Sequence, residues 1–239
     1  MTNLAAPKRT PFIDILQGAV GIGQKLGVVP PSILEKDALM SAAVEETGLS
    51  DFGDPWFEAP FATLLDSIRE EASLNRAGEF AARLQFNKVL CDRLTAIEWF
   101  KQHPEILERS IKRPVVIVGP MRSGTTRLHR LLASDHRFSH MRSFETISPV
   151  PRPGFEDVLA GRKRDFRPTL AKRIMRVARL ANPRTLSIHP TGAYEPEEEL
   201  GLVFTHGNNF VVMPNPDLQR ETGQTFELGA LGEFIWGFF

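Results

Sequence analysis

The sequence predicts an α/β protein built on a P-loop-like parallel sheet flanked by helices, with an N-terminal helical extension. Residues 115–118 form a short apolar run rich in β-branched side chains, which is typical of a strand buried on both faces. A turn rich in small residues follows at 119–124, and residues 125–133 have the pattern of a helix. A strand, a glycine loop and a helix N-terminus together direct backbone N–H groups and the positive end of the helix dipole at one anion.

The chain before this loop is predicted to be helical, as a separate region over residues 1–110. Ser32 and Glu35 suggest a capping box that opens a helix ending at Gly48. Longer helices are expected over 60–75 and 78–101, where apolar residues recur at helical spacing. The stripe of the first of these comprises Phe61, Leu64, Leu65 and Ile68.

Residues 111–239 are predicted to form the α/β domain, with a C-terminal part that is incomplete or divergent. A short second strand is expected over 137–145, a helix over 168–181, a strand over 185–188 and a helix over 195–206. The helix over 168–181 carries four cations, which we interpret as a solvated face: Lys172, Arg173, Arg176 and Arg179.

Composition narrows the classes of function. The 239 residues carry 29 Lys and Arg against 29 Asp and Glu, so no net field attracts nucleic acid or a membrane. The single cysteine, Cys91, excludes an internal disulfide framework and favours a cytoplasmic setting. No apolar run is long enough to span a membrane. Glu197, Glu198 and Glu199 are consecutive and do not converge, so no metal site is expected.

The loop spacing distinguishes between nucleotides. Gly119, Gly124 and Thr126 have the spacing of a P-loop, but Thr125 stands where an ATP- or GTP-hydrolysing enzyme needs lysine. The cation is instead Arg122, which argues against a nucleotide or nucleoside kinase and for a different anionic nucleotide.

The segment 120–126, Pro-Met-Arg-Ser-Gly-Thr-Thr, resembles the 5′-phosphosulfate loop of sulfotransferases, in particular the bacterial branch with arginine in the loop. Supporting segments lie at 51–55, 99–105 and 189–199. The resemblance implies 3′-phosphoadenosine-5′-phosphosulfate (PAPS) as co-substrate without a metal, and as acceptor a hydroxyl or amine of a small metabolite, lipid or glycan. The residues expected to hold the donor are Arg122, Ser123, Gly124, Thr125 and Thr126.

Sulfuryl transfer also needs a base for the acceptor proton. Glu145 is the first candidate, because it lies near where arginine-loop sulfotransferases place a catalytic glutamate, and we expect it at the end of a strand. It could serve if burial raised its pKa; the alternative is a surface glutamate or a partner for Arg142. His189 is the second candidate, because it follows a strand-like run and other sulfotransferase branches use a histidine.

One family feature has no counterpart. Sulfotransferases bind the 3′-phosphate through an arginine on a strand and a serine that opens the next helix. After His189 the sequence holds only Arg220 and no serine, and Arg220 does not resemble this motif. The sequence therefore leaves a second hypothesis, a truncated and non-catalytic nucleotide-binding protein of the same family.

Overall fold

The computed structural model describes residues 10–110, 115–117, 123–152, 154–183 and 191–197, and within these ranges the structure is helical. The elements are α1 (Pro11–Lys25), α2 (Lys36–Thr47), the 3₁₀ turn η1 (Pro55–Phe57), α3 (Glu58–Glu71), α4 (Arg76–Gln102), α5 (Glu105–Glu108), α6 (Thr125–Ala133), α7 (Ser143–Ile147), α8 (Phe155–Leu159) and α9 (Arg167–Ala181).

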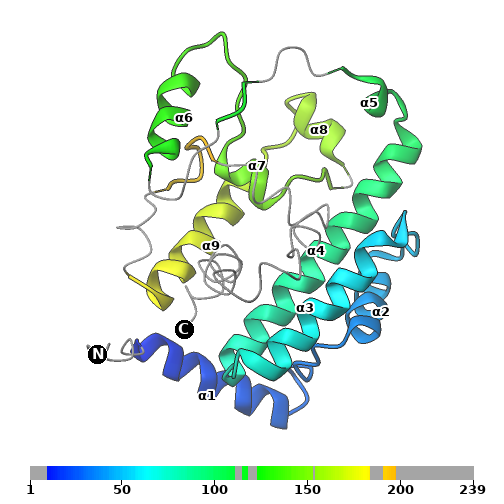
Figure 1. The fold of residues 1–239 in the computed structure, drawn as a ribbon, viewed down its shortest axis with the longest axis vertical. Helices are drawn as coiled ribbons and strands as arrows, with labels where there is room; N and C mark the ends of the chain where they lie inside the picture. Colours follow the sequence, from blue (N-terminus) through cyan, green and yellow to red (C-terminus); the bar gives the residue numbers. More distant parts are fainter. Residues whose placement is uncertain (1–9, 111–114, 118–122, 153, 184–190, 198–239) are drawn as a thin grey trace.

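The main hydrophobic core lies among α2, α3 and α4, and α4 is the longest of the described helices (Figure 1). The predicted stripe of α3 is buried in full, and its Phe61 meets Phe86 of α4 edge to face with ring centroids 5.6 Å apart. Burial of such a stripe stabilises a helix more than its propensity does, because short helices are marginal in water. Helices α1 to α4 therefore lie where the sequence predicts a helical region.

Local signals predicted the C-terminal end of α2 correctly and its N-terminal end wrongly. Gly48 ends α2 in the left-handed conformation, with φ of +69°, as the sequence predicted. The predicted capping box at Ser32 is wrong, since α2 begins at Lys36 and its N-cap residue Glu35 makes no side-chain cap. The chain from Ser32 to Glu35 instead stays irregular, with Leu34 buried in the α2–α4 core. Burial of Leu34 outweighed the local capping signal.

A buried arginine fixes the loop before η1. Arg93 of α4 is 8% exposed and donates from Nε to the carbonyl of Phe52 at 2.7 Å and from Nη2 to that of Asp54 at 3.0 Å. Its guanidinium also lies over the Phe57 ring, 4.1 Å from the centroid. A buried charge is tolerated where its donors are satisfied in this way. The segment 51–55, one of those that resemble the family, is thus held rigidly on α4.

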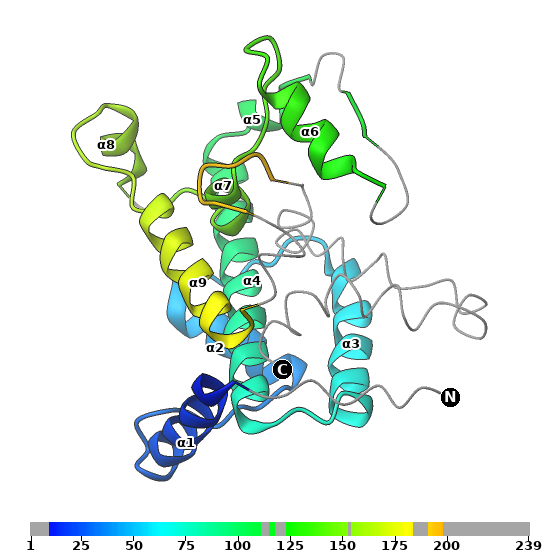
Figure 2. The same cartoon turned by 90° about the vertical axis from the view of Figure 1, so that its left-hand side faces the viewer.

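A second, smaller cluster joins α7, α9 and the segment 191–197. Phe144, Ala171 and Ala193 are buried together there. Two contacts tie this part to the N-terminal helices: Trp99 of α4 donates from Nε1 to the carbonyl of Pro151 at 3.1 Å, and Thr10 donates to that of Ala181 at 3.2 Å. Figure 2 shows α9 ending near α1 and crossing beside α4. The expected division at residue 110 stays a prediction.

The strands expected around the loop are not found within the described residues. Residues 115–117 are irregular, and Val115 and Val116 are 60% and 75% exposed, so the predicted strand buried on both faces is wrong for this part. An apolar run becomes a strand only when a neighbour pairs with its backbone. Among the described residues, β pairing is limited to one isolated antiparallel bridge between Arg142 and Pro196.

Two further expectations are corrected near that bridge. The second strand expected over 137–145 is wrong, because α7 begins at Ser143 and places Glu145 in its first turn. The helix expected from residue 195 is also wrong at its start, because 195–197 pairs with the chain before α7. The strand expected over 185–188 lies outside the described residues.

Candidate functional site

Gly124 is the N-cap residue of α6. It has φ of +93°, a left-handed conformation that glycine adopts without steric cost, and nothing lies within 4 Å of the position a Cβ would take. Its carbonyl accepts the N–H of Leu128 at 3.0 Å, so α6 begins at Thr125, as predicted. Ser123 and Gly124 are exposed. An exposed helix N-terminus with a glycine cap can present backbone N–H groups to an anion.

Two of the predicted site residues fall outside the described part of the chain. They are Arg122, the cation of the loop, and His189, the second candidate base. Ser123, Gly124, Thr125 and Thr126 are described, as is Glu145. In Figures 1 and 2 the N-terminal end of α6 points away from α7, so the described residues do not bring the loop against the candidate base.

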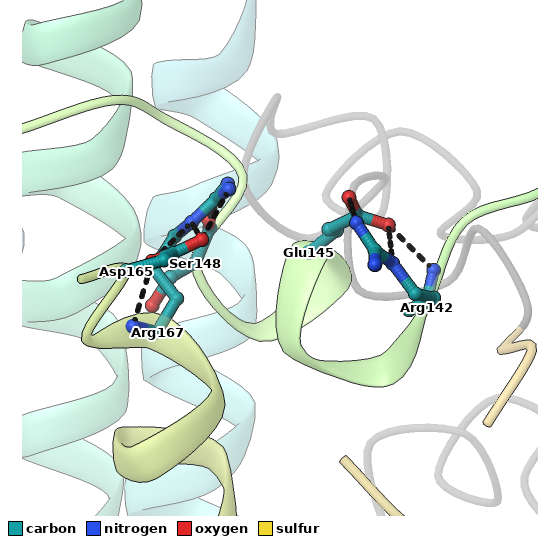
Figure 3. A network of polar contacts seen from close by, with 5 residues as sticks. All are labelled: Arg142, Glu145, Ser148, Asp165 and Arg167. Atoms are coloured by element: carbon teal, nitrogen blue, oxygen red, sulfur yellow. Dashed lines mark hydrogen bonds and ion pairs between the residues drawn. The ribbon is translucent and has the colours of Figure 1, made fainter. Parts of the chain in front are cut away.

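Glu145 is paired with Arg142, as Figure 3 shows. Arg142 donates from Nη2 to Oε1 at 2.6 Å and from Nε to Oε2 at 3.1 Å. Its backbone N–H donates to the same Oε2 at 2.8 Å, so Glu145 also caps the helix in which it stands. This two-point contact is the geometry that guanidinium and carboxylate favour.

The electrostatics of Glu145 follow from that contact. The hydrogen bonds from Arg142 lower the pKa of the carboxyl, and this outweighs desolvation, which acts in the opposite direction. The sequence argument required burial to raise the pKa of Glu145 toward neutrality, and in this arrangement the pKa lies below its usual 4.5. The carboxylate is therefore ionised at neutral pH and able to accept a proton, but it is a weak base while Arg142 holds it.

Arg142 shares an aromatic support with Arg167 of α9. The guanidinium carbons lie 4.5 Å and 5.2 Å from the centroid of the buried Phe144 ring. Arg167 is held in turn by Asp165, with Nη2 to Oδ2 at 2.8 Å, and reaches the carbonyl of Ser148 at 3.5 Å (Figure 3). Cation–π contacts of this kind stabilise an arginine that already has a carboxylate partner.

Sequence reasoning missed a hydrogen-bonded group beside Glu145. Ser143 is 1% exposed, and its Oγ lies 3.0 Å from Thr191 Oγ1 and 3.1 Å from Glu197 Oε2. Thr191 Oγ1 donates to the same Glu197 oxygen at 2.6 Å. No signal in the sequence pairs Ser143 with residues about fifty positions away.

The four cations of α9 lie on its exposed side, as the sequence predicted. Lys172 lies over the Tyr194 ring at 5.2 Å from the centroid. None of the four has an ion pair with a residue that the structure describes.

Within the described ranges, no three His, Cys, Asp or Glu side chains gather as a metal site. None of the helices described here is both long and apolar enough to cross a membrane.

The exposed, glycine-capped N-terminus of α6 can face an anion, and Glu145 stands on a separate element, α7. Comparison with known proteins indicates the class of protein. Residues 114–218 match the model of the sulfotransferase family. The structure is similar to sulfotransferase STF1 from Mycobacterium tuberculosis H37Rv, with 26% identity and a TM-score of 0.58 over 84% of this chain and 55% of that one. No curated protein matches the sequence significantly.

A second solved structure shows the same fold. Sulfotransferase STF9 from Mycobacterium avium matches with a TM-score of 0.60 and 19% identity, over 86% of this chain and 54% of that one. Over residues 114–218 the chain is therefore similar to the sulfotransferase family. It spans about half the length of the solved structures that it matches. The likeness supports the predicted α/β class, while the parallel sheet itself stays a prediction.

Proposed function

We propose that this protein transfers a sulfuryl group from PAPS to a hydroxyl, or less favourably an amine, of a small metabolite, lipid or glycan. The observation that carries the proposal is Gly124, a positive-φ N-cap inside the segment that matches the sulfotransferase family. A kinase is disfavoured because Thr125 replaces the lysine that holds nucleoside triphosphates.

In the proposed reaction the loop holds the donor. The backbone N–H groups at the start of α6 and the hydroxyls of Ser123, Thr125 and Thr126 would donate to the 5′-phosphate. Arg122 would neutralise charge that develops on the bridging oxygen as the S–O bond breaks. The acceptor oxygen attacks sulfur in line, 3′-phosphoadenosine-5′-phosphate leaves with the bond electrons, and the acceptor proton passes to a base.

Glu145 is the base that we propose, with His189 as the second candidate. The pairing with Arg142 sets a condition on this role, since a carboxylate held by two N–H donors is a poor proton acceptor. Arg142 would have to release one or both of these bonds when donor and acceptor are bound.

Donor binding is the first test. Thermal unfolding of the full chain would be followed with 3′-phosphoadenosine-5′-phosphate and, separately, with ATP and Mg²⁺. Ligand at a hundredfold excess over Kd stabilises by about 2.7 kcal/mol, roughly a 5–10 °C rise in Tm for a chain of this size. We expect this rise with the first ligand alone. A rise with ATP and Mg²⁺ alone would favour the kinase reading.

Variants locate the binding. Arg122→Ala should abolish the rise in Tm, whereas Arg127→Ala, which removes an exposed cation of α6, should keep it. Loss in both variants would indicate a general charge effect. Binding without sulfuryl transfer to any acceptor tested would support the alternative, a non-catalytic nucleotide-binding protein of this family. An Arg122→Ala variant that binds like the wild type would overturn the assignment of the loop.

A further inference from the structure

The helix that carries Glu145 is too short to be stable alone. α7 spans five residues, far below the length at which an isolated helix persists in water. The first N–H groups of any helix also lack partners within it. In α7 two of these groups are satisfied from residues about fifty positions later: Ser143 N–H donates to the carbonyl of Glu195 at 2.9 Å, and Phe144 N–H to that of Ala193 at 3.0 Å.

Further hydrogen bonds, one from the backbone and others from side chains, connect the segment 191–197 to α7 and the residues before it. Glu197 N–H donates to the carbonyl of Met141 at 3.0 Å, and the Glu197 carboxylate receives Thr191 and lies against buried Ser143. We call Ser143, Thr191 and Glu197 the hydroxyl–carboxylate clasp. Both ribbon views place the orange segment 191–197 beside α7 (Figures 1 and 2).

Hydrogen bonds join the three members of the clasp to one another. Two hydroxyls bring two protons, and the carboxylate brings only acceptors. The Thr191 proton goes to Glu197 Oε2 at 2.6 Å. The Ser143 proton then goes to Thr191 Oγ1, to the same Glu197 oxygen, or to the carbonyl of Glu195 at 3.4 Å. Removal of the Thr191 hydroxyl takes one hydrogen-bond partner from Ser143 and one from Glu197, and a typical hydrogen bond contributes about 0.5–1.5 kcal/mol.

We propose that Ser143, Thr191 and Glu197 are positioning residues that hold the first turn of α7, and so set the place of the Glu145 carboxylate for the acceptor proton. The inference rests on the proposed function, because it takes Glu145 as the base. Glu145 is two residues after Ser143, and its bond to the Arg142 N–H exists only while that first turn keeps its shape.

The test uses a matched set of variants in the full chain. Thr191→Val keeps the shape of the side chain and removes the hydroxyl, whereas Thr191→Ser keeps the hydroxyl. Thr146→Val is the structural control. The Thr146 hydroxyl donates to the Ser143 carbonyl at 2.9 Å, so the substitution weakens α7 but leaves the three side chains of the clasp unchanged. The first readout is the titration of the Glu145 carboxyl by NMR, which requires no turnover.

The charged groups that act on Glu145 are Arg142, next to α7, and Arg167 from α9. With the clasp broken, the Arg142 contact loosens, so the pKa of Glu145 should rise toward 4.5 in Thr191→Val and stay near the wild-type value in Thr191→Ser and Thr146→Val. An unchanged titration in Thr191→Val, or an equal rise in Thr146→Val, would overturn the proposal.

Kinetics provide the second readout. Misplacement of a catalytic group lowers turnover steeply, so we expect kcat to fall about tenfold or more in Thr191→Val with the KM for PAPS unchanged. A fall confined to KM would contradict a role at Glu145. If the wild type shows no sulfuryl transfer, the proposed function fails while the NMR titration still decides whether the clasp positions Glu145.

Discussion

At the scale of single residues, the site is governed by the contact between Arg142 and Glu145. The carboxylate accepts three hydrogen bonds from one arginine, two from the guanidinium and one from the backbone. With 27% of the Glu145 side chain and 43% of the Arg142 side chain exposed, solvent screens the pair, and its contribution to stability is modest. Its effect on protonation matters more, since it sets whether Glu145 can act as a base.

This contact makes stability depend on pH through Glu145. Because the pKa is lowered on folding, the stabilisation is fully present above the unfolded value of 4.5 and is lost as pH falls through the folded value. Glu145→Gln should therefore be less stable than the wild type at pH 7, by about 1 kcal/mol or less. The difference should shrink as pH drops below 4.5.

Urea unfolding at several pH values measures this difference. Glu70→Gln, which removes an exposed carboxylate of α3 with no ion pair among the described residues, is the control for the loss of one negative charge. A deficit in Glu145→Gln that stays constant from pH 7 to pH 3 would show that the Arg142 contact does not lower the pKa of Glu145.

At the scale of elements, two glycines differ in whether the backbone conformation requires glycine. Gly48 ends α2 with φ of +69°, where an L side chain is strained, although no atom lies within 4 Å of its Cβ position. Gly18 is an exposed residue inside α1 with no atom near its Cβ position and no positive φ. The same substitution should therefore have opposite effects at the two sites.

We expect Gly18→Ala to stabilise the protein by about 0.5–1 kcal/mol, because alanine loses less backbone freedom in a helix. Gly48→Ala should destabilise it by about 1 kcal/mol, because a left-handed alanine is strained. Chemical unfolding of the two single variants measures both effects. Equal signs for the two substitutions would contradict the assignment of Gly48 as a left-handed cap.

At the scale of the whole molecule, burial is unevenly distributed. The core among α2, α3 and α4 contains most of the buried apolar residues, while the cluster around Phe144 is small. Helix α6 buries none of its residues, and its Leu128 and Leu131 are 48% and 68% exposed. Elements with few buried contacts open at low free energy.

Hydrogen exchange should follow this distribution. Amides in the middle of α3 and α4 should exchange only through global unfolding, whereas those of α6 should exchange within the fastest class. Exchange measured by mass spectrometry on the free protein checks this order. Addition of 3′-phosphoadenosine-5′-phosphate should slow exchange in α6 first, because the proposed donor site lies at its N-terminus. Equal protection of α6 and α4 in the free protein would contradict the expected difference in local stability between these helices.

The sequence by itself determined the features that depend on near neighbours along the chain. The helical stripe of α3, the glycine end of α2, and the span of α6 after Gly124 could all be predicted from local spacing and capping. The loop motif also predicted the similarity to sulfotransferases, and residues 114–218 match the model of that family.

The tertiary structure alone decided the surroundings of Glu145. A strand was expected there, but the first turn of α7 is completed by carbonyls from the segment 191–197, and contacts between such distant residues leave no local pattern. The hydrogen bond of buried Ser143 to Glu197 and the contact of Arg167 with the Phe144 ring likewise join residues that are distant in the sequence. Local spacing specifies which backbone conformations are favourable, whereas the pKa and place of a side chain depend on groups that only folding brings near.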